Sequence, residues 1–171
     1  EAAFFDPGRR ASGRRLYSVR DYHPPLSIID SWLPLPLGVK ISPGVNLGEI
    51  DRYDCEVEFI SLDGELKECA LWFGSLQTTT RRATLLSARS SPIFLTSSDS
   101  PRHPVHLSPP LAFLYEPDPA ILRAGLVSTL AAQLNAAQLD PDIAYLTSDA
   151  LTVTPFARAF AIEAAMPFSQ K

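Results

Sequence analysis

The sequence is poor in cysteine and contains no apolar run long enough to cross a bilayer. The two cysteines of the chain are Cys55 and Cys69. If Asp63 and Gly64 form a two-residue hairpin turn, these cysteines lie three positions out of register on the facing strands. We therefore expect free thiols and a cytoplasmic protein without a membrane partner. We also expect no secretory signal, because the first residue leads into an apolar strand rather than a basic leader.

Two common ligand motifs are missing as well. Only eight glycines occur, and none of them forms a Gly-x-Gly-x-x-Gly loop or a close variant, the motif that binds dinucleotides in α/β proteins. His103 and His106 are three positions apart, but they stand in a proline-rich stretch with no nearby cysteine. We expect no metal there, because zinc sites need further ligands at defined spacings.

Positive charge is in the minority and is concentrated at the N-terminus. The formal net charge is −4, yet residues 1–20 contain five arginines against only Glu1 and Asp6. The acidic balance argues against a protein that coats nucleic acid nonspecifically. We expect any anionic partner at this N-terminal loop. The alternative is a solvated loop whose arginines contact only water.

The chain opens with a short apolar run, residues 2–5, that stops at Asp6-Pro7-Gly8-Arg9-Arg10. This order predicts a strand followed by a carboxylate, a rigid turn and cations at the carboxyl edge of a sheet, where open α/β folds bind ligands. A buried parallel strand needs a neighbour on each side, and nothing precedes this one. We therefore expect a piece of a longer protein, cut inside an α/β domain.

The next elements predict a parallel pair of strands. Residues 8–25 have the composition of a long loop, and residues 26–33 carry apolar side chains at helical spacing before Pro34 and Pro36. Residues 38–42 then predict a short buried strand. Strand, crossover and strand in this order favour a right-handed parallel unit.

The clearest local signal is a β-hairpin. Residues 56–62 and 65–73 are rich in strand-forming residues and flank Asp63-Gly64, which predicts a type I′ turn. Residues 82–86 predict one more strand. From 87 to 110 the chain is rich in Ser, Pro, Arg and His, which predicts a linker or a surface excursion.

A second unit is predicted from about residue 111. Asp118 is a natural N-cap with Pro119 at the first helical position, and we expect the helix to end near Ala136. Residues 143–147 and 156–162 predict two strands. A unit this small has only marginal stability by itself, so we expect it to pack against the first unit. Leucines recur every four residues and predict one buried stripe: Leu122, Leu126, Leu130 and Leu134.

Two parallel strands followed by an antiparallel hairpin resemble the end of the Rossmann-like S-adenosylmethionine-dependent methyltransferases. Residues 4–10 are similar to that family's Asp/Asn-Pro motif, and residues 40–44 and 64–72 extend the resemblance. The tail resembles a bacterial branch with a C-terminal THUMP-like domain. The matching segments there are residues 115–120, 123–126, 139–141 and 144–147.

This resemblance implies an α/β fold in three parts. Residues 1–90 are expected to be the second half of a Rossmann-like methyltransferase sheet, 91–110 a linker, and 111–171 an incomplete α+β THUMP-like domain. It implies S-adenosylmethionine as the cofactor of the intact protein only, because the Gly-rich loop is expected upstream of Glu1. The fragment is therefore expected to be inactive alone. THUMP domains are associated with RNA, so the resemblance implies an RNA substrate by analogy of fold.

The candidate site residues follow from the same motif. Asp6 and Pro7 are the expected catalytic pair, and Asp6 is the one residue here that would touch the cofactor. Arg9 and Arg10 are candidates for holding a phosphate or carboxylate of the substrate. Lys40 ends a strand at the same edge and is the third substrate-binding candidate; the alternative is an ion pair with Asp6 or Glu68.

A function of a different class stays open. In that reading the chain is a noncatalytic binding or assembly module, Asp6 caps its own turn, and the basic N-terminal loop is a docking surface. Where amino-methylating relatives carry an aromatic, this sequence has Gly8-Arg9, which argues against a flipped nucleobase as substrate. Under either reading the apolar first strand is an open edge, so we expect self-association through it.

Overall fold

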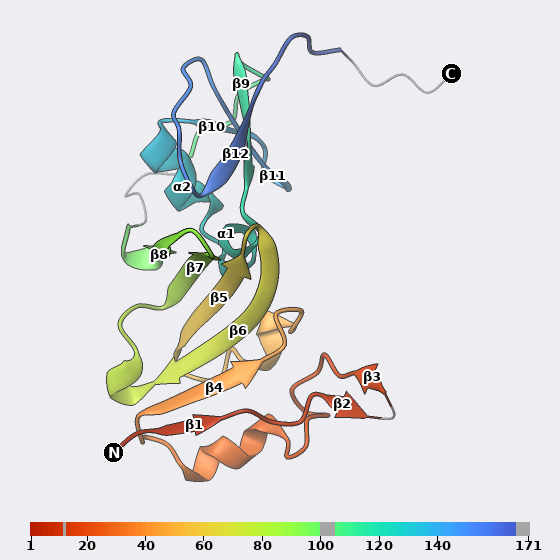
Figure 1. The fold of residues 1–171 in the computed structure, drawn as a ribbon, viewed down its shortest axis with the longest axis vertical. Coiled ribbons are helices and arrows are strands. Elements are labelled where there is room, and N and C mark those ends of the chain that lie inside the picture. Colours follow the sequence, from red (N-terminus) through yellow and green to blue (C-terminus); the bar gives the residue numbers. More distant parts are fainter. Residues whose placement is uncertain (12, 100–104, 167–171) are drawn as a thin grey trace.

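A six-stranded mixed sheet organises the first half of the chain (Figure 1). The computed structural model describes residues 1–11, 13–99 and 105–166. Across the sheet the strand order is β1-β4-β6-β5-β7-β8. In chain order these strands are β1 (Ala3–Phe5), β4 (Leu37–Ile41), β5 (Glu56–Leu62), β6 (Glu65–Phe73), β7 (Arg81–Ser87) and β8 (Ser90–Thr96).

A four-stranded antiparallel sheet with two short helices forms the second half, in the order β10-β11-β9-β12. Its elements are β9 (Phe113–Pro117), α1 (Pro119–Ala124), α2 (Val127–Leu134), β10 (Ala137–Asp140), β11 (Ile143–Ser148) and β12 (Ala157–Ala161). The connections of the first half contain the ribbon β2 (Arg10–Ala11) with β3 (Arg14–Arg15), and the 3-10 turns η1 (Leu26–Ser31), η2 (Leu47–Glu49), η3 (Gly74–Leu76) and η4 (Ser97–Asp99).

The predicted strand arrangement is confirmed. β1 pairs parallel with β4, and β6 lies antiparallel between β4 and β5. The hairpin has the predicted bounds, and Asp63 (φ 49°) and Gly64 (φ 82°) both adopt the positive φ of a type I′ turn. Cys69 faces Phe59 rather than Cys55, and both cysteines are free thiols, as expected.

The predicted helix over residues 26–33 is a 3-10 turn instead, η1. Pro25 precedes it and Pro34 follows shortly after it, so the segment is too short for a cooperative α-helix, and no side chain caps its first turn. Its apolar spacing still buries Leu26 and Ile29.

The expectation of a linker after residue 87 is wrong for its first part. Residues 90–96 form strand β8, which pairs antiparallel with β7 and buries Leu95. Ser and Pro dominate the local composition and conceal the strand, and Pro92 is tolerated because β8 lies at the sheet edge. Within the same stretch, His103 lies outside the described residues, and His106 is exposed.

The single predicted helix over residues 118–136 is two helices. Asp118 caps α1 by accepting a hydrogen bond from the Ala120 amide at 2.8 Å, as predicted, but the chain breaks at Gly125, whose φ is 72°. A glycine reaches this left-handed conformation without a Cβ clash and so ends α1. Leu122 is consequently 52% exposed, whereas the other three leucines of the predicted stripe are buried.

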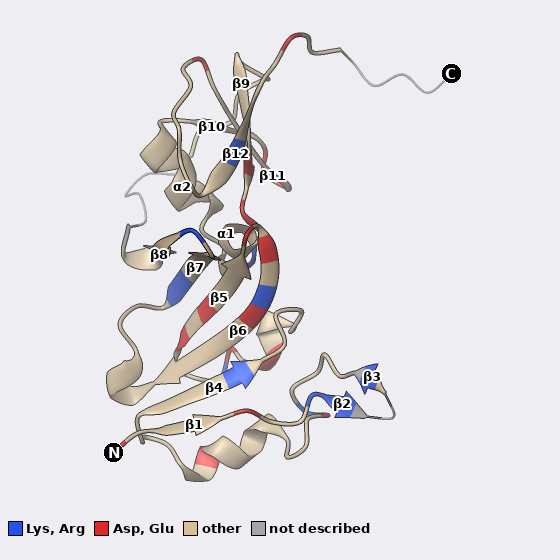
Figure 2. Ribbon diagram, viewed as in Figure 1, with Lys and Arg blue, Asp and Glu red and all other residues tan. Residues whose placement is uncertain are grey.

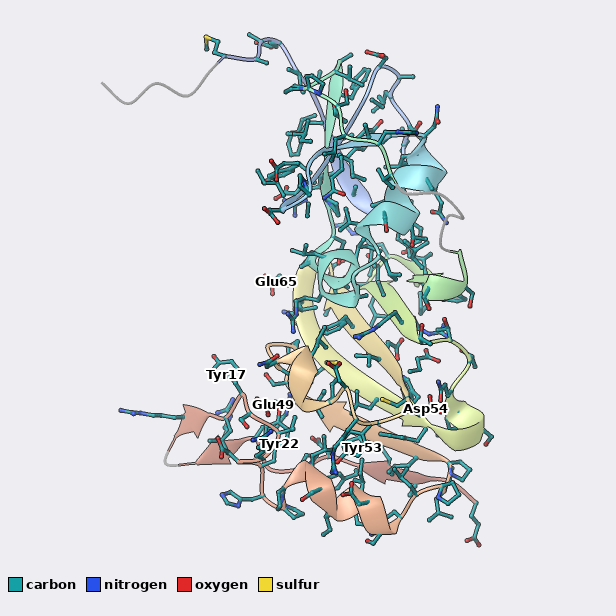
Figure 3. All side chains as sticks on the ribbon, turned by 180° about the vertical axis from the view of Figure 1, so that it is seen from behind. Tyr17, Tyr22, Glu49, Tyr53, Asp54 and Glu65 are labelled. Carbon is teal, nitrogen blue, oxygen red and sulfur yellow. The ribbon has the colours of Figure 1, made fainter. Side chains whose placement is uncertain are left out.

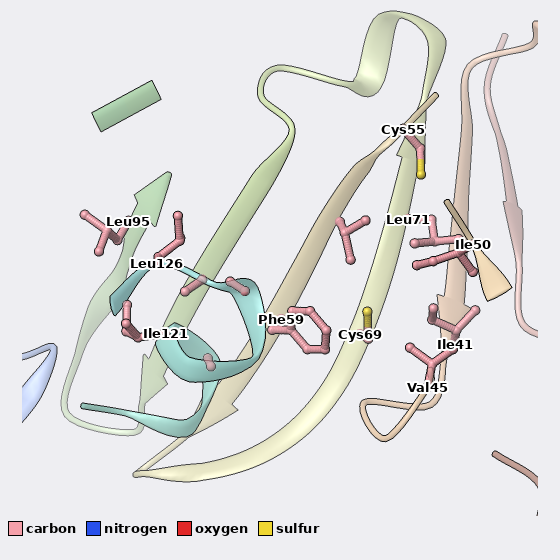
Figure 4. Packing of buried hydrophobic residues seen from close by; sticks show 14 of the residues in the cluster. Ile41, Val45, Ile50, Cys55, Phe59, Cys69, Leu71, Leu95, Ile121 and Leu126 are labelled. Carbon is pink, nitrogen blue, oxygen red and sulfur yellow. The ribbon is translucent and has the colours of Figure 1, made fainter. Parts of the chain in front are cut away.

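The second unit packs on the first, as expected. Helix α1 lies against β5 and β7, and Ile121 and Leu126 join Phe59 and Leu95 in one apolar cluster (Figure 4). Burying a side chain such as Ile121 completely contributes about 1.5–3 kcal/mol. Among the described residues, none of the helices combines the length and the hydropathy that crossing a membrane requires.

Candidate active site

The carboxyl ends of β1 and β4 place Asp6 beside Lys40. The two strands are parallel and Phe5 faces Val39, so the next residue of each strand falls at the same edge of the sheet. Lys40 Nζ lies 3.6 Å from Asp6 Oδ2 and 3.5 Å from Glu68 Oε1, on β6. Lys40 thus forms ion pairs with both Asp6 and Glu68, the alternative to a substrate-binding role.

Arg9 completes this charged cluster of Asp6, Arg9, Lys40 and Glu68. Its Nη1 donates to the carbonyl of Ile41 at 2.9 Å, and its Nη2 to Glu68 Oε2 at 3.1 Å. The Arg9 side chain is only 14% exposed, whereas that of Asp6 is 51% exposed. Arg9 therefore fastens the loop to the end of β4, while Asp6 presents its carboxylate to solvent.

Arg10, the second arginine of the motif, has a different environment. It is exposed on the β2–β3 ribbon, where Figure 2 shows arginines gathered, and no ion pair involves it within residues 1–11, 13–99 and 105–166. Pro7 is buried beneath the turn. Of the two arginines, Arg10 is the one with a guanidinium available to an anionic ligand.

The loop that carries Asp6 is held in place by distant residues. Gly8 and His23 exchange two backbone hydrogen bonds, at 2.9 and 3.0 Å. The buried Tyr22 hydroxyl accepts a hydrogen bond from the Ser42 amide at 2.9 Å, just beyond β4. Burial raises the pKa of Tyr22, although the Ser42 bond and Arg9 oppose the shift. The phenol therefore stays neutral and anchors the loop.

Glu49 is a second anchor of this loop, and nothing in the sequence pointed to it. Its Oε2 accepts hydrogen bonds from Ser18 Oγ at 2.8 Å and from the Val19 amide at 3.0 Å. Figure 3 shows Glu49 near Tyr17 and Tyr22 at this side of the molecule. No local pattern reveals such a contact, because the partners are about thirty residues apart.

Neither the two cysteines nor the potential metal ligands in the described part of the chain form a second site. Burial raises the pKa of Cys55 to about 12 and raises the pKa of Cys69 further still, so both thiols are poor nucleophiles at neutral pH. Among the residues that the structure describes, no group of three or more His, Cys, Asp or Glu side chains could hold a metal ion.

The fold and the charged cluster define an α/β protein with a carboxylate-bearing site at the carboxyl edge of a mixed sheet. Two proteins of Mycobacterium tuberculosis strains, each named an uncharacterized S-adenosylmethionine-dependent methyltransferase, are 33% identical to this chain over 171 residues. The aligned region covers 97% of this chain and 46% of each relative. The chain thus spans about half the length of these relatives.

A solved structure supports the same relationship. The crystal structure of a candidate methyltransferase from Porphyromonas gingivalis superposes with a TM-score of 0.75 at 25% identity, covering 98% of this chain and 44% of that one. No family model matches the chain. The two relatives and the solved structure are thus all named as methyltransferases, the class of protein that the sequence resembles.

Proposed function

We propose that this chain is the substrate-facing part of an S-adenosylmethionine-dependent methyltransferase, with Asp6 directed at the reacting group. The observation that carries the proposal is the half-exposed Asp6 carboxylate, held by Lys40 where the carboxyl ends of β1 and β4 meet. Relatives that align with nearly the whole chain bear that activity in their names.

These residues fit only part of a site for the methyl donor. Asp6 is accessible to it, but the eight glycines form no Gly-rich loop for its methionine end. We therefore assign the remainder of the donor site to the part of the longer relatives that this chain does not cover. When bound, the donor would supply an electrophilic methyl group, whose bond to sulfur would break as the substrate lone pair attacks in line and the neutral thioether leaves.

Asp6 acts on the attacking group in this proposal. Its carboxylate accepts a hydrogen bond from an N–H or O–H of the substrate and so orients the lone pair that forms the new bond. Pro7 restricts the turn behind Asp6, while Lys40 and Arg9 hold the cluster in place. Arg10, exposed beside the cluster, is assigned the anionic part of the substrate.

An RNA substrate is the finer part of the proposal and rests on the THUMP-like resemblance. The assignment of residues 1–90 to a Rossmann-like half and of 111–171 to a THUMP-like domain has the same support. An exposed phosphate-binding arginine, Arg10, is consistent with it. A cytoplasmic location is part of the proposal, and the unpaired thiols of Cys55 and Cys69 support it.

Calorimetric titration of S-adenosylmethionine and S-adenosylhomocysteine tests the proposal. We expect binding to the longer protein encoded with this chain and none to the 171 residues alone. In the longer protein, Asp6→Ala removes the hydrogen-bond acceptor and is expected to lower methyl transfer to unfractionated bacterial RNA about 100-fold or more while the donor still binds. The matched control, Asp21→Ala, changes an exposed carboxylate of the same loop and is expected to remain active.

Different results of these experiments would contradict different parts of the proposal. Donor binding with no methylation of RNA, but with methylation of protein, overturns the RNA assignment alone. Equal activity of the Asp6 and Asp21 variants overturns the role of Asp6. If neither protein binds the donor, the methyltransferase proposal fails and the noncatalytic docking module replaces it; the exposed Phe4 on edge strand β1 favours that alternative.

A further inference from the structure

A cleft of about 860 Å³ lies where the two units of the chain meet. It is bounded by the Asp63–Gly64 turn and the far end of β7 on one side, and by α1, β11 and β12 on the other. It shares no residue with the charged cluster. A cavity of this size is in the range that encloses small organic ligands.

Ser61 contributes an unsatisfied hydroxyl to this cleft. Its side chain is completely buried, and its Oγ has no hydrogen-bond partner in residues 1–11, 13–99 and 105–166. Ser61 alternates with the buried Val57 and Phe59 on β5, so it lies on the sheet face that α1 covers. A buried hydroxyl without a partner is unfavourable, so the packing at this end of the cleft is imperfect.

Large apolar side chains are left exposed on the opposite wall. Leu122 on α1 is 52% exposed, and Ile143 and Tyr145 on β11 are 48% and 39% exposed. All three residues line the cleft. This wall can cover the apolar body of a ligand of modest size.

The rim of the cleft is acidic. Asp63, Glu116, Asp118 and Asp142 line it, against the single cation Arg158. Asp118 is occupied in capping α1, but no ion pair involves the other three carboxylates within the described part of the chain. This excess of unpaired carboxylates favours a cationic ligand over an anionic one.

We propose that this cleft binds a small aromatic or aliphatic amine. Its ammonium group lies at the acidic rim that includes Asp63 and Asp142, and its apolar body lies against Leu122, Ile143 and Tyr145. This assignment is independent of the proposed methyltransferase function. The residues of the cleft differ from those of the charged cluster at Asp6, and the rim of the cleft carries an excess of negative charge.

Three indole compounds with different charges test the assignment in the 171-residue chain. We expect tryptamine, which carries an amine, to bind saturably and at least about tenfold more tightly than neutral indole or anionic indole-3-acetate, measured by calorimetry. Equal binding of the three, or no saturable binding of tryptamine at millimolar concentration, overturns the proposal. Tighter saturable binding of a lysine-rich hexapeptide overturns the small-ligand assignment in favour of a protein partner.

Matched variants locate the site. Asp142→Asn is expected to weaken tryptamine binding about threefold, whereas Asp149→Asn, an exposed carboxylate outside the cleft, leaves it unchanged. Ser61→Ala is expected to raise the melting temperature, because it removes an unsatisfied buried hydroxyl. Identical affinities of tryptamine for the Asp142 and Asp149 variants contradict the assignment.

Discussion

Glu56→Ala is expected to destabilise the protein by about 3–5 kcal/mol, the usual cost of removing one partner from a buried ion pair. Glu56 is 1% exposed at the start of β5, and its Oε1 pairs with Arg82 on β7. Its Oε2 accepts hydrogen bonds from the amides of Thr78 at 2.8 Å and Thr79 at 3.2 Å. One carboxylate thus joins the hairpin to the chain that leads into β7.

Thermal unfolding followed by circular dichroism measures this effect. For a chain of this length, 1 kcal/mol corresponds to about 2–4 °C, so the melting temperature is expected to fall by about 6–20 °C. The matched control is Glu65→Ala on the same hairpin, where the carboxylate is solvent-exposed and forms an ion pair with Lys67. Its melting temperature is expected to stay close to that of the unaltered chain.

The effect also has a defined pH dependence. Burial acts to raise the pKa of Glu56, but the hydrogen bonds from Arg82 and Thr78 outweigh it, and the pKa is lowered in the folded state. The ionised carboxylate therefore contributes stability above its unfolded pKa of about 4.5, and this contribution is lost as the pH falls through the lowered folded value. A gap between Glu56→Ala and the unaltered chain that stays constant into strong acid would refute this reasoning, as would equal melting temperatures for the Glu56 and Glu65 variants.

Three further predictions concern the close packing at Gly38, the two buried thiols and the exposed edge strand β1. Gly38→Ala places a Cβ 2.7 Å from Trp72 and 2.8 Å from Phe4, so it is expected to lower the unfolding free energy by about 1–3 kcal/mol in urea titrations, and an unchanged midpoint contradicts this. Cys55 and Cys69 are expected to resist Ellman's reagent in the native protein and to give two equivalents in denaturant; rapid native labelling contradicts their burial. Phe4→Lys is expected to abolish self-association of the β1 edge in light scattering, and equal masses for both proteins at high concentration count against edge pairing.

Elements with strong local signals were predictable. The β5–β6 hairpin has the predicted bounds because Asp63-Gly64 favours a type I′ turn whatever surrounds it. Asp118 and Pro119 likewise mark the start of α1. The parallel pairing of β1 with β4 followed from the order of the elements, since a crossover of this length favours it.

Elements with weak or conflicting signals were not predictable. β8 has a Ser- and Pro-rich sequence and is a strand because β7 offers it an unpaired edge. Gly125 was compatible with a continuous helix, and only its left-handed backbone conformation separates α1 from α2. Ser61 is an ordinary strand serine in the sequence; its unsatisfied hydroxyl exists because the second unit packs over that end of β5.

The candidate active site likewise combines residues that the sequence indicated with contacts that only the tertiary structure determined. Asp6, Pro7 and the arginines were recognisable from the sequence alone, because a strand that stops at a carboxylate, a proline and cations carries its own local signature. That Arg9 and Lys40 both engage Glu68, and that Glu49 and Tyr22 anchor the loop, was decided by the tertiary structure. These contacts join residues about twenty to sixty positions apart, and sheet order rather than local periodicity determines which of them meet.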